Sequence, residues 1–158
     1  RATTSQCGVT NAYADPSQLG ADRWASLIGA WHLHRGPSLV VNAGTATTVD
    51  MLSSGGLFRG GLILPGIDLM RRALAENTAG LPRAQGNYAA EPRNTADAIE
   101  SGCVHAQAGA IERVFAALEP GAICFLSGGA AARIALRLNI PLRVVENLAL
   151  EGLARIVA

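Results

Sequence analysis

The sequence predicts one α/β domain in which a sheet that contains a hairpin is covered by packed helices. The central segment, 39–64, is rich in apolar and β-branched residues and is punctuated by glycine pairs, a pattern typical of strands joined by turns. Apolar residues recur at helical spacing on both sides of that segment. The chain has 158 residues, of which 49% are hydrophobic and 16% are charged, so it is long enough to bury a core of its own.

Composition and charge bear on the class of protein. The formal net charge is +1 without a run of basic residues, which gives no support for nucleic-acid binding. No apolar stretch reaches the roughly 18 residues of a membrane span, so we expect no membrane association. Cys7, Cys103 and Cys124 have no paired spacing and predict free thiols in a reducing cytoplasm. The three histidines form no metal-ligand pattern.

The first part of the chain predicts two helical segments. Asp15 and Pro16 form a helix-start signal, since aspartate is a good N-cap and proline suits the first helical position. A longer helix is expected over 22–34, where apolar residues recur at helical spacing. Asp22 and Arg23 then fall in its first turn. The residues alone indicate that Asp22 interacts with the helix dipole and that Arg23 is solvated.

The central segment predicts a hairpin. We expect a first strand over 39–49, a turn with positive φ at the glycine pair 55–56, and a partner strand over 57–64. Within the first strand, Gly44 followed by Thr45 offers backbone N–H groups and one hydroxyl to an anionic group. A simple hairpin explains the same residues.

The second half of the chain alternates helices and strands. Arg71 and Arg72 are expected on the solvated side of their helix, and Gly102 indicates close packing of the long helix, within the chain or between subunits. The expected elements are a helix over 67–77, a loop over 78–93, a helix from Asn94 to about 118, a strand over 123–126, a helix to about 138, a strand over 142–145 and a last helix over 148–157 that is capped by Asn147.

Three motifs, spread over four stretches of sequence, resemble a known family. N-A-G-T-A-T-T-V-D at 42–50, followed by G-G-L-I-L-P-G at 60–66, is similar to the second phosphate-binding segment of the type III pantothenate kinases. G-A-D-R at 20–23 and N-T-A-D-A-I-E-S-G at 94–102 resemble two further motifs of that family. The family belongs to the acetate kinase–Hsp70–actin–sugar kinase superfamily. The resemblance therefore implies one lobe of the actin-like, ribonuclease H-like ATPase fold, with a mixed sheet.

The resemblance also implies a substrate site. Asp22 matches the general base, and Arg23 matches the residue that holds the substrate carboxylate, preferably by a paired contact. The chemistry is consistent, because a primary alcohol must lose a proton as it attacks a phosphate. An ordinary helix N-cap explains Thr95 equally well. The positions that match the lining of the substrate pocket are Tyr13, Gly20, Ala21 and Thr95.

The nucleotide positions follow from the same resemblance. Thr45, together with Gly44, matches the segment that binds ATP phosphate. Gly128 and Gly129 match a turn that packs against adenosine, although tight packing between a strand and a helix explains this pair about as well. Magnesium is expected to arrive with the nucleotide.

Asn42 departs from the family pattern. The family has an aspartate there that ligates a monovalent cation, potassium or ammonium. Asparagine keeps a carbonyl oxygen that can ligate a cation but loses the negative charge, so we expect weaker cation binding. Asp50 is an alternative carboxylate for that ion, and a polar strand end explains Asp50 as well.

Together these expectations describe a function. The resemblance implies a homodimeric enzyme that phosphorylates pantothenate with ATP, giving 4′-phosphopantothenate in the first step of coenzyme A biosynthesis. The family's D-x-G-N-[ST] phosphate loop has no counterpart here, so residues 1–158 are expected to be a C-terminal lobe that is nearly inactive alone. The alternative is a kinase-inactive regulator similar to the Bvg accessory factor proteins, which acts on gene expression through a partner. Asn42 favours that alternative.

Overall fold

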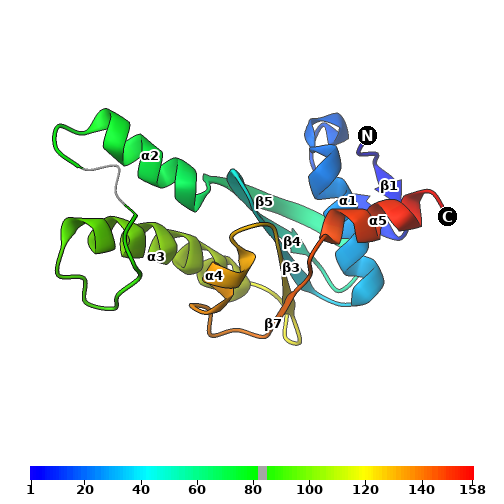
Figure 1. Ribbon diagram of the computed structural model, residues 1–158. Coiled ribbons are helices and arrows are strands. Elements are labelled where there is room, and N and C mark those ends of the chain that lie inside the picture. Colours follow the sequence, from blue (N-terminus) through cyan, green and yellow to red (C-terminus); the bar gives the residue numbers. More distant parts are fainter. Residues whose placement is uncertain (82–84) are drawn as a thin grey trace.

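The structure is a computed structural model that describes residues 1–81 and 85–158. Within these residues, one mixed sheet has the strand order β1-β2-β5-β4-β3-β6-β7 (Figure 1). The strands are β1 (Ser5–Gln6), β2 (Val9–Asn11), β3 (Ser38–Ala43), β4 (Ala46–Leu52), β5 (Leu57–Pro65), β6 (Ile123–Ser127) and β7 (Leu142–Val144). The helices are the 3-10 helix η1 (Pro16–Gln18) and the α-helices α1 (Ala21–Leu33), α2 (Ile67–Asn77), α3 (Thr95–Phe115), α4 (Ala131–Ala135) and α5 (Leu148–Ile156).

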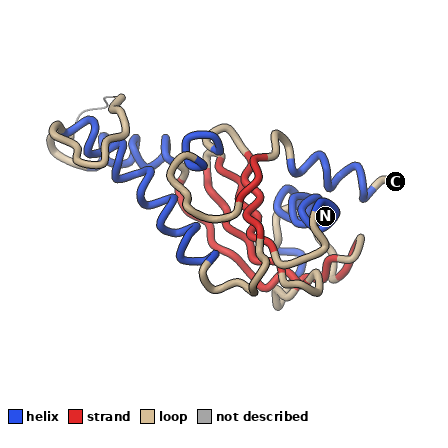
Figure 2. The backbone as a smooth tube through the Cα atoms, turned by 90° about the horizontal axis from the view of Figure 1, so that it is seen from below, coloured by secondary structure: helices blue, strands red, loops and turns tan. Residues whose placement is uncertain are grey.

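Helices cover both faces of the sheet. Alternate side chains of β3 enter different apolar clusters: Leu39 and Val41 face one cluster, and Val40 faces the other. Residues of α3 and α4 complete the first cluster, and residues of α1 and α5 complete the second. Figures 1 and 2 show α1 and α5 side by side at one end of the molecule, with α3 extending away from them. The predicted α/β class is confirmed, and the interior strand β3 is packed against helices on both faces of the sheet.

The expected single strand over 39–49 is wrong. The chain reverses at Gly44 and Thr45, so that β3 and β4 are antiparallel neighbours whose last pair is Ala43 with Thr47. The Gly44 N–H donates to the Ala46 carbonyl at 3.1 Å, which closes the turn. The turn that was expected at the glycine pair 55–56 is present, with φ of +77° at the second glycine. The predicted phosphate segment is therefore a hairpin tip at one end of the sheet.

Local signals predicted the helices well. The helix over 67–77 has the expected bounds, whereas the helix expected to reach 138 ends at Ala135. The short strands β1 and β2 were not predicted, because two or three residues carry no readable alternation. No helix in the described ranges is long and apolar enough to span a bilayer. The predicted caps that accept a hydrogen bond from a backbone N–H of the first turn are Asp15, Asn94 and Asn147.

Cys124 in β6 predicts a measurable pH dependence of stability. It has no exposed surface, and burial raises the pKa of its thiol from 9.0 to about 12. The unfolded chain loses this proton at a lower pH than the folded protein, so the stabilisation is complete below pH 9.0 and is lost as the pH rises toward 12. We expect the free energy of unfolding to fall by about 1.4 kcal/mol per pH unit from this thiol, and Cys124→Val to remove that slope. Urea denaturation of both proteins between pH 9.0 and 12 measures the difference, and equal slopes contradict it.

Candidate functional site

Arg23 points from the first turn of α1 into the protein. Only 5% of the residue is exposed, so the expectation of a solvated Arg23 is wrong. Its Nε donates to Oδ2 of Asp50 at 3.1 Å, and its Nη2 donates to Oδ1 of Asp50 at 2.5 Å and to the Tyr13 hydroxyl at 3.3 Å. The structure thus brings Tyr13 and Arg23 together, with Asp50 as a third member that was not predicted at this position.

The Arg23–Asp50 pair is buried, and burial acts on both groups. Burial raises the pKa of the Asp50 carboxyl, the Arg23 guanidinium opposes that rise, and the charge of Asp22 adds to it. Burial alone lowers the pKa of Arg23, but the hydrogen bonds and the charge of Asp50 outweigh it and raise that pKa. The guanidinium therefore stays protonated. Removing either partner leaves the other buried without its counter-charge, which is costly.

Asp22 directly precedes Arg23 but is exposed. A Cβ on Gly20 would lie only 2.7 Å from Oδ1 of Asp22, so a glycine leaves room for the carboxylate at the helix start. Ala21 begins the helix and is exposed as well. One helix start therefore presents an accessible carboxylate beside an oriented guanidinium, which is an arrangement suited to a base next to an anion-binding group.

A cavity of about 450 Å³ lies at the tip of the β3–β4 hairpin. It brings together three of the residues that match the ATP site and two arginines that were not predicted there. Gly128 does not line the cavity. It holds the neighbouring turn, because its φ is +98° and a Cβ would lie 2.6 Å from the Ala43 carbonyl. The lining residues are Ala43, Gly44, Thr45, Ile67, Asp68, Leu69, Arg72, Gly129, Ala130 and Arg133.

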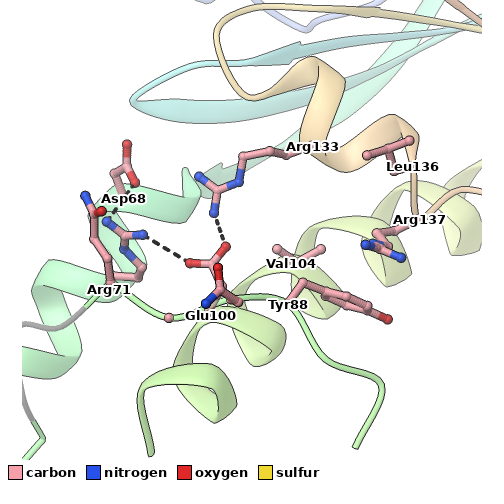
Figure 3. Close-up of a pocket in the computed structure, with 11 residues that line it drawn as sticks. Asp68, Arg71, Tyr88, Glu100, Val104, Arg133, Leu136 and Arg137 are labelled. Carbon is pink, nitrogen blue, oxygen red and sulfur yellow. Dashed lines mark hydrogen bonds and ion pairs between the residues drawn. The ribbon is translucent and has the colours of Figure 1, made fainter. Parts of the chain in front are cut away.

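A second cavity, of about 480 Å³, shares Asp68 and Arg133 with the first (Figure 3). Figure 3 shows Arg71 and Arg133 converging on Glu100, which is 3% exposed. Arg71 donates to this carboxylate at 3.1 Å, and Arg133 also donates to it. The expectation that Arg71 is solvated is wrong, because Arg71 is paired with Glu100. The sequence of α2 contains no local pattern that indicates a partner on α3. The two cavities are therefore neighbours, and guanidinium groups line both of them.

One wall of the second cavity is aromatic. The guanidinium of Arg137 stacks 3.7 Å from the centre of the Tyr88 ring, and Figure 3 shows the two side chains next to each other. The Tyr88 hydroxyl lies 3.3 Å from Nε2 of His105. This wall offers flat surfaces beside the arginines of the cavity, and none of these three residues was assigned a binding role from the sequence.

Thr95 does not lie near Tyr13 and Arg23. It begins α3 at the end of that helix that is far from α1 (Figures 1 and 2), and it is exposed. It lines the rim of a mainly apolar groove of about 770 Å³ between α2 and α3. Gly102 lines the same groove, and a Cβ there would meet no other atom of the described chain. The structure therefore does not bring Thr95 to Tyr13 and Arg23, and close packing at Gly102 within the chain is wrong.

Asn42 lies on the side of β3 that faces α1. Its Nδ2 donates to the Ser26 hydroxyl at 3.0 Å, and across the ladder it pairs with Thr48. The Thr48 hydroxyl oxygen is buried and has no hydrogen-bond partner among the described residues. Carbonyl and hydroxyl oxygens of this kind suit a hard cation. Asp50, the alternative carboxylate, is instead taken up by Arg23. Among residues 1–81 and 85–158, no group of three or more His, Cys, Asp or Glu could hold a metal.

Sequence comparisons agree with these motifs. A family model described as type III pantothenate kinase matches residues 1–117. The chain is 63% identical over 155 residues to a protein named type III pantothenate kinase from Aromatoleum aromaticum, and 60% identical over 160 residues to one from Azoarcus sp.. These matches cover 97% and 100% of this chain, which spans 64% and 61% of the two relatives.

A structural comparison supports the fold. The crystal structure of a conserved putative Baf family transcriptional activator from Campylobacter jejuni matches with a TM-score of 0.71 and 24% sequence identity. The match covers 96% of this chain and 68% of that one. At this identity the similarity concerns the fold alone, and it agrees with the predicted fold class.

Proposed function

Since this chain belongs to the type III pantothenate kinase family, we propose that the protein transfers the γ-phosphate of ATP to the 4′-hydroxyl of pantothenate. The observation that carries the proposal is the exposed Asp22 carboxylate beside the buried Arg23 guanidinium at one helix start. Arg23 and Tyr13 bind the substrate carboxylate, and Asp22 accepts the proton of the attacking hydroxyl.

The nucleotide occupies the cavity at the hairpin tip. The backbone N–H and the hydroxyl of Thr45 face the phosphates, Gly44 lets them approach the main chain closely, and the guanidinium groups of Arg72 and Arg133 offset their charge. The nucleoside lies beside the turn that carries Gly129. A magnesium ion bound to the nucleotide supplies further neutralisation of phosphate charge. The chain itself contributes the positioning groups named here.

We propose that the protein acts in the cytoplasm as a homodimer and that residues 1–158 correspond to a C-terminal lobe. The apolar groove between α2 and α3 fits a contact with a second copy, because burying such a surface is favourable. Thr95 lies far from Arg23 within one chain, so a shared substrate contact requires the second copy. Phosphoryl transfer depends on positioning from both sides of the phosphate, and we expect this lobe alone to be nearly inactive.

Pantothenate-dependent release of ADP by the full-length gene product tests the proposal. We expect release in potassium buffer, less release in sodium buffer, and none without pantothenate. A folded protein that releases no ADP under any of these conditions contradicts the kinase. That result favours the second candidate, a regulator without kinase activity, for which Asn42 is the specific observation.

Asn42→Asp tests the cation position. Asn42 Oδ1 and the unpartnered Thr48 hydroxyl are the oxygens that hold the monovalent cation in our proposal. A carboxylate adds a negative charge there, so we expect the potassium concentration for half-maximal activity to fall about tenfold. A potassium titration of both proteins measures this change, and Ser54→Asp, at an exposed position in the turn after β4, is the control for added charge. An unchanged titration places the cation elsewhere.

A further inference from the structure

Asp50 determines which N–H groups of Arg23 remain available to bind a ligand. A guanidinium has five N–H donors, and Asp50 and Tyr13 accept three of them, from Nε and from Nη2. No acceptor for Nη1 lies among the described residues. We propose that Asp50 is a positioning residue that presents the Nη1 edge of Arg23 to the substrate carboxylate, and that Gly61 provides the space for it. This inference rests on the proposed kinase function.

The sheet holds Asp50 rigidly. Asp50 lies in β4, where Val40 of β3 and Gly61 of β5 are its neighbours in register. Both sides of its backbone are therefore paired, and the side chain has no exposed surface. Arg23 has a long flexible side chain, which loses its freedom when two oxygens of a fixed carboxylate hold it. The direction of the guanidinium thus follows from the sheet and not from α1.

Gly61 is the reason that the carboxylate fits. A Cβ at this position would overlap with Oδ1 of Asp50 and would lie 2.6 Å from the Val49 carbonyl. Unlike Gly60, which has φ of +117°, Gly61 does not need a glycine for its backbone angles. Space beside Asp50 is therefore what this position requires. Any side chain there displaces the carboxylate and releases Arg23.

The arrangement also limits how the substrate is recognised. The paired face of Arg23 is taken by Asp50, so a substrate carboxylate receives hydrogen bonds from Nη1 and not through the paired contact that the sequence suggested. Because Asp50 offsets the charge of Arg23, recognition depends on the direction of these N–H groups more than on net charge. Loss of Asp50 should therefore weaken substrate binding even though the site becomes more positive.

Steady-state kinetics of the full-length gene product test this role. We expect Asp50→Asn to raise the KM for pantothenate about 100-fold, with much smaller effects on kcat and on the KM for ATP. Gly61→Ala should behave in the same way. Gly109→Ala, a substitution in α3 whose Cβ meets nothing within 4 Å, should leave all three constants unchanged. The decisive measurement is Asp50→Asn in an Arg23→Ala background, where we expect no further rise in KM.

The outcomes separate the possibilities. Multiplying effects of Asp50→Asn and Arg23→Ala overturn the positioning role, because they mean that Asp50 acts independently of Arg23. A wild-type protein without pantothenate-dependent turnover contradicts the kinase itself. In that case the Nε–H resonance of Arg23 in nitrogen-15 spectra still decides the geometry. It should be protected from solvent exchange in the wild type and unprotected in Asp50→Asn, and an unprotected wild-type resonance rules out the buried pair.

Discussion

Asp22→Asn is expected to lower kcat for pantothenate phosphorylation by about 10²- to 10⁴-fold, the contribution typical of a positioned general base. Asparagine has nearly the same shape and cannot accept the proton of the attacking hydroxyl. Arg23 and Tyr13 are not altered, so the KM for pantothenate should change little. Steady-state measurement of ADP release gives both constants. Because Asp22 is exposed, the substitution should not disturb folding, and a lower kcat would therefore report on the chemical step.

A matched control isolates the chemical role of Asp22. Glu151→Gln removes an acid from the first turn of α5 in the same way, and Glu151 is also exposed. Each substitution loses a favourable interaction with a helix dipole, about 0.3 to 1 kcal/mol, so their effects on thermal stability should be similar. Only Asp22→Asn should affect kcat. Equal kcat values in the two variants would mean that Asp22 serves the helix and that another group accepts the proton.

Local signals account for what could be predicted of the fold. Helix 67–77 and the cap at Asn94 depend on neighbours within a few residues, and the structure confirms them. The reversal at Gly44 and Thr45 could not be separated from a continuing strand, because the β-branched pattern runs on either side of two turn residues. In α3, the apolar Ala106 is exposed, whereas the polar Gln107 is fully buried.

Tertiary contacts explain the remaining differences between the sequence-based predictions and the structure. Gln107 is buried because its amide donates to the Pro65 carbonyl at 2.7 Å, a partner 42 residues away. The Arg23–Asp50 pair spans 27 residues and joins a helix to the middle of a sheet. Side-chain pattern gives no signal for such a pair, and resemblance to a family identified Arg23 without its partner. Residue types near a site can therefore be named from sequence, but the charge balance that orients them requires the fold.

The crossing of α1 and α5 leads to the largest stability prediction. A Cβ on Gly152 would overlap with the Ala25 carbonyl, and a Cβ on Gly29 would lie 2.5 Å from the Leu148 carbonyl. The two helices thus touch backbone to backbone at facing glycines, and no flexible side chain can move aside. We expect Gly152→Ala to lower the free energy of unfolding by about 3 kcal/mol, at the upper end for overpacking. Urea denaturation measures this loss.

Gly152→Ala should also affect the candidate substrate site, because α1 carries Asp22 and Arg23. Moving α1 outward separates Arg23 from Asp50, which belongs to the sheet. The KM for pantothenate should therefore rise at temperatures where the variant is still folded. Gly109→Ala is the control: its Cβ has open space, and alanine in a helix should stabilise by about 0.5 to 1 kcal/mol. If Gly152→Ala unfolds at the same urea concentration as the wild type, α1 and α5 do not cross at this distance, and the site does not depend on their contact.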